Sequence, residues 1–148
     1  NGFERLIRLL SILQDMALAQ DYTLLNAGGF AVEVHAQDHE RMRMICDFVD
    51  EHFQRHITLD EIAAIVSMTV PAFCRYFKKL TNKTFTHFVN EFRIAHACRM
   101  LSDEHLSISA VSYESGFNNL SHFNKIFRHT TGVNPRDYRR SLLKLVRA

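Results

Sequence analysis

Polar and basic side chains gather on one face of each of two expected helices in this 148-residue chain. In the first helix, Phe73 and Phe77 lie four residues apart and predict an apolar stripe that packs inward. Residues 71–83 include several basic side chains and no acidic one. An exposed basic helix face is suited to the phosphates and base edges of a nucleic acid. The face opposite the stripe carries Val70, Pro71, Cys74, Arg75 and Lys78.

The same pattern recurs about fifty residues later, where Phe123 and Phe127 form the apolar stripe. A short amphipathic helix and a brief turn precede each basic helix, which begins after Thr69 in the first copy and after Asn119 in the second. Both are good N-cap residues, and the free N–H groups of a capped helix suit a phosphate. The repetition predicts one helix-turn-helix unit built twice. The outward face of the second copy carries Leu120, Ser121, Asn124, Lys125 and Arg128.

The two outward faces differ in their hydrogen-bonding groups. The first face has one strong base-binding donor, Arg75, because its other members before Lys78 have none. In the second face the Asn124 amide can bind adenine N6 and N7, and Lys125 can reach guanine O6 or N7. We therefore expect sharper base discrimination by the second face. Phosphate contacts or cap roles are expected for Thr69, Lys78, Lys79, Asn119, Arg128 and Arg139, with a solvated surface role as an equal alternative for Lys79.

Four motifs occur in order in the chain: FCRYFKKLT at 73–81, FVNEFRIAHACRML at 88–101, ISAVSYESGF at 108–117 and SHFNKIFRHTTGVNPRDYR at 121–139. Together they resemble the AraC/XylS family of transcription regulators. The resemblance covers about residues 42–140 and implies two helix-turn-helix units joined by a long helix, with double-stranded DNA and RNA polymerase as partners. Where the family often has Gly and Pro after the first recognition helix, this chain has Asn82 and Phe85. Asn82 is compatible with the fold because Asn tolerates the left-handed conformation of a helix C-cap.

Composition agrees with an all-α fold and a polyanionic partner. The chain has only 2 Pro and 5 Gly, and helical apolar spacing recurs along it. Residues 1–40 carry two basic and six acidic side chains (net −4), and residues 41–148 carry sixteen and ten (net +6). Positive charge therefore coincides with the duplicated unit, as binding to DNA phosphates requires. Three isolated cysteines and the lack of a long apolar run predict a reduced, cytoplasmic protein that does not span a membrane.

Residues 1–40 are expected to contain an amphipathic helix over 2–20 and a connector over 21–37. The resemblance implies that this part is the trailing end of a sensor or dimerisation domain. Because the helix is apolar on more than one side, we expect residues 1–20 to bind a second copy or a further domain, with packing on the rest of this chain as the alternative.

Residues 41–148 are expected to form the DNA-binding domain. Its expected parts are a helix over 42–53 capped by Asp38, a first helix-turn-helix over about 59–80, a linker helix over about 84–101 and a second helix-turn-helix over about 107–130. In the second unit, Ile108, Val111 and Tyr113 are expected to face inward from its first helix.

The linker helix is expected to set the distance between the two units. Eighteen residues span about 27 Å, compared with roughly 34 Å between two major-groove faces one turn apart. Phe85, Phe88, Phe92 and Ala95 follow one another at spacings of 3, 4 and 3, and this pattern predicts a single stripe on which both units dock. One protomer is therefore expected to contact two adjacent groove segments.

Enzymatic and metal-binding alternatives have little support in the sequence. There is no Gly-rich phosphate loop and no nucleophile elbow. Two histidine pairs, His35 with His39 and His52 with His56, have the i, i+4 spacing of metal ligands but lack a third ligand nearby. We therefore expect no enzyme activity, metal or cofactor. The alternative that remains is a helical protein–protein interaction module whose basic faces bind an acidic partner.

Overall fold

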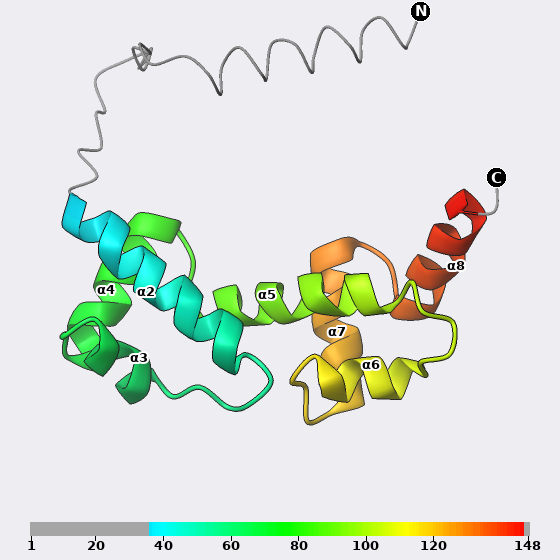
Figure 1. Cartoon of the computed structure of the whole chain (residues 1–148), viewed down its shortest axis with the longest axis horizontal. Coiled ribbons are helices and arrows are strands. Elements are labelled where there is room, and N and C mark those ends of the chain that lie inside the picture. Colours follow the sequence, from blue (N-terminus) through cyan, green and yellow to red (C-terminus); the bar gives the residue numbers. More distant parts are fainter. Residues whose placement is uncertain (1–35, 147–148) are drawn as a thin grey trace, which may run out of the picture. The chain divides into compact units, whose positions relative to one another are not determined.

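A computed structural model describes residues 36–146, which form seven α-helices and no β-strand (Figure 1). The all-α prediction is confirmed for these residues. The predicted helix over 2–20 and nearly all of the predicted connector lie outside the described residues. The helices are α2 (Ala36–His52), α3 (Leu59–Ile65), α4 (Val70–Thr81), α5 (Phe85–Met100), α6 (Ile108–Glu114), α7 (Leu120–Thr131) and α8 (Pro135–Val146).

Helices α2, α3 and α4 pack with the N-terminal half of α5 around one core, and we call this part the first lobe. Aromatic rings fill its centre, because Phe85 lies edge-on to Phe73 and Phe77 with centroid distances of 5.4 and 5.6 Å. Phe73 and Phe77 are both fully buried, so the inward stripe predicted for α4 is confirmed. The buried core residues are Ile45, Val49, Phe53, Ile62, Ala63, Val66, Phe73, Phe77, Phe85 and Val89.

Helices α6, α7 and α8 pack with the C-terminal half of α5 around a separate core, which defines the second lobe. The ring of Phe127 lies 5.5 Å from that of Phe123 and 5.4 Å from that of Tyr138 on α8. Both Phe123 and Phe127 are fully buried, so the stripe predicted for α7 is confirmed too. The buried core residues are Ile94, Ala97, Leu101, Val111, Phe117, Phe123 and Phe127.

One inward assignment in α6 is wrong. Tyr113 was expected to face the core and is 58% exposed, whereas the neighbouring Ser112 is fully buried. Ser112 occupies the place that Ala63, also buried, occupies in α3. A small side chain at this position allows close packing between the two helices of a unit, so size rather than hydrophobicity decides which residue is buried there.

The linker helix α5 uses opposite faces for the two lobes, which corrects the single stripe expected from sequence. Phe85 and Val89 belong to the first core, and Ile94 and Ala97 belong to the second. Nine residues separate Phe85 from Ile94, and at about 100° per residue the two side chains point in opposite directions. Ala95, placed on the expected stripe, is exposed. The predicted extent of the helix agrees closely, with Thr84 as its N-cap and Leu101 as its C-cap.

Helix α2 begins earlier than expected, at Ala36 rather than Met42. Asp38 therefore lies inside the first turn of the helix instead of capping it, and its carboxylate lies 3.9 Å from Arg41. The hydroxyl of Tyr76 on α4 donates to the backbone oxygen of Asp38 at 3.4 Å. The first turns of α2 are polar, so apolar periodicity could not reveal them.

The duplication seen in sequence extends to the way each recognition helix ends. The Thr81 hydroxyl donates to the Phe77 carbonyl at 2.8 Å, and the Thr131 hydroxyl donates to the Phe127 carbonyl at 2.8 Å. The next residue in each copy is a left-handed C-cap, Asn82 with φ of 58° and Gly132 with φ of 81°. The predicted role of Asn82 is therefore confirmed.

The turn inside the first helix-turn-helix holds Ser67 at φ of 55°, and the equivalent turn of the second holds Gly116 at φ of 83°. A left-handed conformation costs roughly 1–2 kcal/mol for a residue with a Cβ, and Gly avoids this cost. Gly also raises the conformational entropy of the unfolded chain, which offsets part of the stabilisation. We expect Ser67→Gly to raise the free energy of unfolding by about 0.5 kcal/mol. Urea denaturation measures it, and an unchanged or lower midpoint would contradict the strain at Ser67.

Candidate nucleic-acid interface

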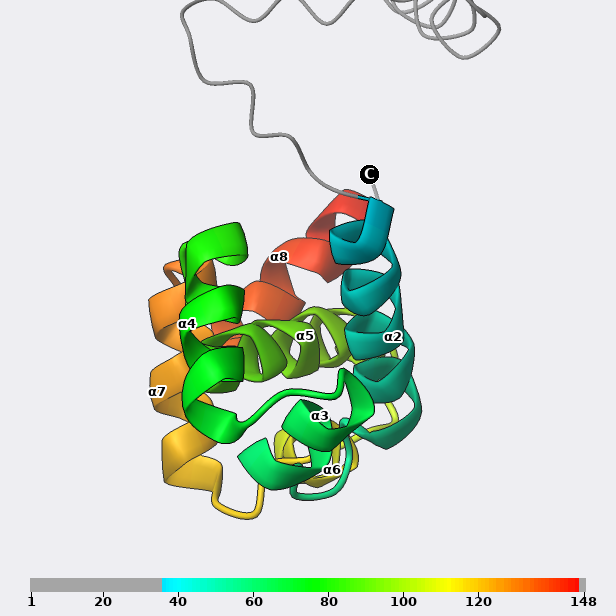
Figure 2. The ribbon, with the colours of Figure 1, turned by 90° about the vertical axis from the view of Figure 1, so that its left-hand side faces the viewer.

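The two recognition helices, α4 and α7, lie on the same side of α5. They are displaced from one another along this helix, with α4 in the first lobe and α7 in the second (Figure 1). A view along the molecule shows both on one side and α2 on the other (Figure 2). The outward faces of both helices are therefore available to a single extended ligand.

The outward face of α4 matches most of the prediction. Pro71, Cys74, Arg75 and Lys78 are exposed. Val70 differs, because it is half-buried and packs against the first core. The exposed members combine an apolar surface with two cations, and the guanidinium is the group best able to bind a base edge.

The outward face of α7 has the same layout with more polar chemistry. Ser121, Asn124, Lys125 and Arg128 are exposed, whereas Leu120 is half-buried and packs against the second core. Leu120 and Val70 both begin their helix, so the first residue of each recognition helix anchors it to its lobe. The amide and the two cations remain free to contact a ligand.

Cations on the two recognition helices are unpaired, in contrast to many of those elsewhere. Over residues 36–146, the unpaired cations on α4 and α7 are Arg75, Lys78, Lys79, Lys125 and Arg128, and neither helix contains an acidic residue. Away from them, Arg55 lies 2.9 Å from Glu61 and Lys83 lies 2.7 Å from Glu91. Unpaired cations on a face without carboxylates can neutralise phosphates without first breaking an ion pair.

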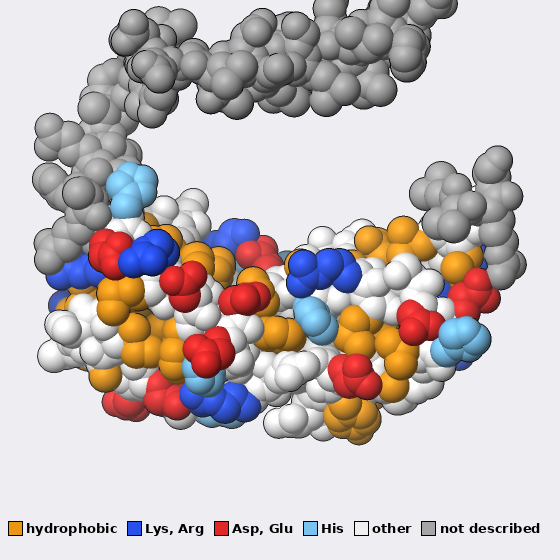
Figure 3. Space-filling model, in the orientation of Figure 1, with side chains coloured by type: hydrophobic (Ala, Val, Ile, Leu, Met, Phe, Trp, Pro, Cys, Tyr) orange, Lys and Arg blue, Asp and Glu red, His pale blue; other side chains and the backbone are white. Residues whose placement is uncertain are grey.

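The side of the molecule that bears α2 has a different charge pattern. Acidic and basic side chains are intermixed there, with apolar side chains between them (Figure 3). On α2, Arg43 pairs with Glu40 at 2.6 Å. This side therefore mixes both signs of charge, whereas α4 and α7 carry no acidic residue.

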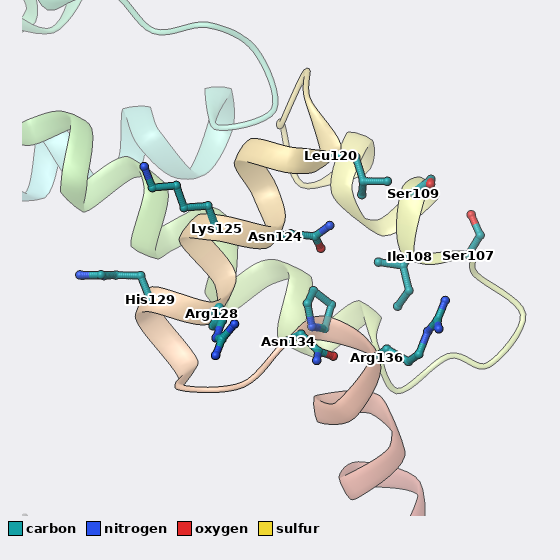
Figure 4. A pocket seen from close by; sticks show the side chains of 11 residues that line it. Ser107, Ile108, Ser109, Leu120, Asn124, Lys125, Arg128, His129, Asn134 and Arg136 are labelled. Carbon is teal, nitrogen blue, oxygen red and sulfur yellow. The ribbon is translucent and has the colours of Figure 1, made fainter.

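An open groove of about 1100 Å³ runs beside α7 in the second lobe. Asn124 points into the groove, whereas Lys125 and His129 extend from the other side of α7 (Figure 4). Arg136 at the start of α8 faces the same groove. The lining residues are Ser107, Ile108, Ser109, Leu120, Asn124, Lys125, Arg128, His129, Asn134, Pro135 and Arg136.

Both predicted N-cap positions are occupied as expected, and the caps differ in chemistry. The Asn119 side chain accepts a hydrogen bond from the His122 backbone N–H at 3.0 Å. Thr69 begins α4 with extended backbone, and its side chain makes no cap hydrogen bond. The hydroxyl of Thr69 is therefore available to a ligand, whereas the amide oxygen of Asn119 is engaged by its own helix.

Arg139, predicted to contact phosphate, is half-buried in the second lobe. Its Nε donates to the Leu101 carbonyl at 3.1 Å and so ties α8 to the end of α5. Arg140 beside it is exposed and pairs with Asp137. Arg139 therefore has a structural contact that the sequence did not indicate, and its phosphate contact stays a prediction.

Residues 36–146 contain no group of three or more His, Cys, Asp or Glu side chains that could hold a metal ion. His35 lies outside the described residues, and the Nδ1 of His52 lies 3.0 Å from the Phe48 carbonyl. Within the same part of the chain, none of the helices has the length and apolar character needed to cross a membrane.

Comparison with known proteins identifies the architecture. A family described as a helix-turn-helix domain matches residues 62–141, which is more than half of the chain. The chain is 28% identical over 143 residues to an uncharacterised HTH-type transcriptional regulator, YdeC, of Bacillus subtilis, covering 92% of this chain and 49% of that protein. A transcriptional regulator of AraC type from Chromobacterium violaceum superposes with a TM-score of 0.65 at 21% identity, over 72% of this chain and 95% of that one. The chain belongs to the AraC-type helix-turn-helix family.

This AraC-type domain also has the fold of a protein seen on DNA. The DNA-binding domain of AdpA, a global transcriptional factor whose structure was solved in complex with a target DNA, superposes with a TM-score of 0.63 at 24% identity, over 68% of this chain and 91% of that one. The matched relatives are described as HTH-type transcriptional regulators rather than as enzymes. The chain spans about half the length of the Bacillus relative.

The structure of this AraC-type domain adds residues to the candidate interface that sequence reasoning missed. Ser107, Ser109 and Arg136 line the groove beside Asn124, although they lie outside the recognition helices. Ser107 caps α6 through the Ala110 backbone N–H at 3.0 Å. The position of Arg136 directly after Pro135, which begins α8, is the one feature of the sequence that could have indicated it. In the structure Arg136 makes no ion pair among the described residues.

Proposed function

We propose that this domain binds double-stranded DNA with one protomer and contacts two adjacent major-groove segments, as part of a transcription regulator in the cytoplasm. The observation that supports it most is the placement of α4 and α7 on one side of α5, each with exposed, unpaired cations. A helical interaction module would not require two basic helix faces on the same side of α5.

The dimensions of α5 agree with the proposal. Its 16 residues span about 24 Å, which is of the same order as the roughly 34 Å between major-groove faces one turn apart. Helices α4 and α7 are held by opposite ends of this rod. DNA bending supplies the remaining difference, at a cost of about 1–6 kcal/mol.

The finer parts of the proposal concern specificity. The first recognition helix offers Arg75 as its base-binding donor, beside the apolar Pro71 and Cys74, and so favours thymine methyls and groove shape. The second offers Asn124 for adenine and Lys125 for guanine. The block under α7 is therefore the more selective of the two.

Base contacts and phosphate contacts are distinguished by two variants of α7. Asn124→Ala is expected to cost about 1–3 kcal/mol on the best site and to relax the preference at one base pair. Arg128→Ala is expected to weaken every sequence equally and to reduce the salt slope by about 1. Binding of single-base variants of the site measures both effects. An unchanged preference profile for Asn124→Ala would show that another face of α7 enters the groove.

A salt titration tests the proposed function itself. Affinity for duplex DNA should fall linearly in a double-logarithmic plot, with a slope of about −0.9 for each phosphate contact. The three unpaired cations of α4 and α7 that are not assigned to base edges, Lys78, Lys79 and Arg128, contribute about −2.7 to this slope. Lack of affinity at low salt, or a slope near zero, would favour the helical interaction module instead.

Protein partners follow from the same proposal. As part of a transcription regulator the domain would act beside RNA polymerase, and residues 1–20 would join it to a second copy or to a sensor domain. The support is the family and the apolar width of residues 1–20. Light scattering with and without residues 1–20 separates self-association from a monomer.

A further inference from the structure

Three segments distant in sequence meet where the two lobes adjoin, and Arg93 on α5 lies among them. Its Nε donates to the Phe53 carbonyl at 2.7 Å, and its Nη2 donates to the Arg55 carbonyl at 2.8 Å. Both carbonyls belong to the loop that follows α2 in the first lobe. A guanidinium presents several donors in a fixed planar fork, so one side chain fixes two points of that loop.

The other side of the guanidinium contacts the second lobe. It lies 5.7 Å from the ring centroid of Phe117, in the turn between α6 and α7. Arg93 is half-buried, and this burial lowers the pKa of its guanidinium. Next to it, the side-chain amide of Gln54 donates to the Glu114 carbonyl at 2.9 Å, from the loop after α2 to the end of α6. The loop and the turn lie next to one another below α5 in Figure 1.

The second lobe approaches so closely at Gly116 that no side chain fits there. A Cβ at this position would lie 2.5 Å from the Phe53 carbonyl oxygen and 3.0 Å from Arg93 Nε. The chain offers a matched position in Gly132, whose φ of 81° is nearly that of Gly116 at 83°. A Cβ on Gly132 would have nothing within 4 Å.

We infer that this contact, which we call the lobe junction (Phe53–Arg55, Arg93 and Gly116–Phe117), fixes the angle between the two lobes and therefore between the two recognition helices. The lobes use opposite faces of α5, so the junction adds a direct contact between them to the connection through that helix. The inference deepens the proposed function and rests on it for its effect on DNA. Arg93 is a positioning residue, since its donors are occupied by backbone carbonyls of the first lobe.

Residual dipolar couplings of the isotope-labelled full chain test the junction without DNA. In the wild type, one alignment tensor should fit the amides of both lobes. Arg93→Met keeps an apolar stem near Phe117 and removes the forked donors, so each lobe should require its own tensor. Arg99→Met is the matched control, because Arg99 lies exposed on the same helix and its guanidinium makes no hydrogen bond or ion pair among residues 36–146.

The glycine pair gives a second, independent test. Gly116→Ala and Gly132→Ala introduce the same strain at positive φ, but only the first forces a Cβ against the Phe53 carbonyl. The lobe tensors should diverge in Gly116→Ala and coincide in Gly132→Ala. If Arg93→Met does not fold, Arg93→Lys replaces it, since an ammonium keeps the charge but loses the fork. A single tensor for both lobes in the folded Arg93 variant and in Gly116→Ala would overturn the inference, because α5 alone would then hold the lobes.

Binding to a selected duplex then measures the consequence for recognition. Arg93→Met should lose about tenfold in affinity for the two-block site, because the second contact is no longer held at a fixed effective concentration. Its affinity for a single block should be unchanged, and it should tolerate one added base pair between the blocks better than the wild type. A general loss of stability would weaken both kinds of site together and would contradict a positioning role. If no duplex binds the wild type, the proposed function fails, while the dipolar couplings still decide the junction.

Discussion

Adding five base pairs between the two blocks of a selected duplex should lower the affinity of this domain by about a hundredfold. Half a helical turn places the two blocks on opposite faces of the DNA. Helices α4 and α7 lie on one side of α5, so a single protomer cannot then contact both blocks. The second block no longer benefits from the high effective concentration that the first contact provides. Gel-shift or fluorescence anisotropy titration measures the loss.

A duplex in which one block is scrambled is the matched control for this insertion. It should bind about as weakly as the five-base-pair insertion, since each leaves one usable block. Equal affinity for the original and the inserted duplex would show that the two helix-turn-helix units do not contact DNA together.

Phe127→Ala should cost about 3–5 kcal/mol of stability, which is the usual range for removing a buried aromatic ring. Phe127 is fully buried, with the rings of Phe123 and Tyr138 at 5.5 and 5.4 Å. The free energy of unfolding of a single domain is only about 5–15 kcal/mol in total. The second lobe of this variant should therefore be largely unfolded. Heteronuclear NMR spectra resolve which lobe loses its dispersed signals.

Phe77→Ala is the matched change in the first lobe, because Phe77 is equally buried and contacts Phe73 and Phe85. Phe77→Ala should lose the base preference in the block that α4 contacts, and Phe127→Ala should lose the base preference in the block that α7 contacts. Each variant should keep part of the preference in the other block. If both variants lose the same block, the assignment of the two cores to two recognition helices is wrong.

The duplication made much of this fold predictable from sequence. Phe73 and Phe123 identified equivalent inward stripes, and both are buried as expected. Asn82 was predicted to take the left-handed cap position and does so. These features are local, since each depends on the spacing of a few neighbouring residues and on backbone preferences that the residue type reveals.

The linker helix shows where this kind of inference fails. The spacing of Phe85, Phe88, Phe92 and Ala95 predicts one apolar stripe, with both lobes packed on the same face of the helix. The structure has two half-stripes on opposite faces, with Ile94 starting the second. Averaged over the whole helix, opposite half-stripes cancel, so periodicity cannot recover them.

The lobe junction could not be predicted for a related reason. Arg93 lies 40 residues from Phe53 in sequence, and its partners are backbone carbonyls, which every residue has. The positive φ of Gly116 is a property that sequence indicates, but the carbonyl facing it is not. Likewise, the contact between Arg139 and the Leu101 carbonyl depends on the docking of α8.

Selection of bound sites from a random duplex pool tests the central claim most directly. The chain should enrich one site with two unlike blocks about 10 base pairs apart centre to centre, bound by one protomer, with the sharper preference in the block that Asn124→Ala relaxes. Enrichment of a single block, or of a palindrome bound by two protomers, would contradict recognition of two adjacent grooves by one protomer.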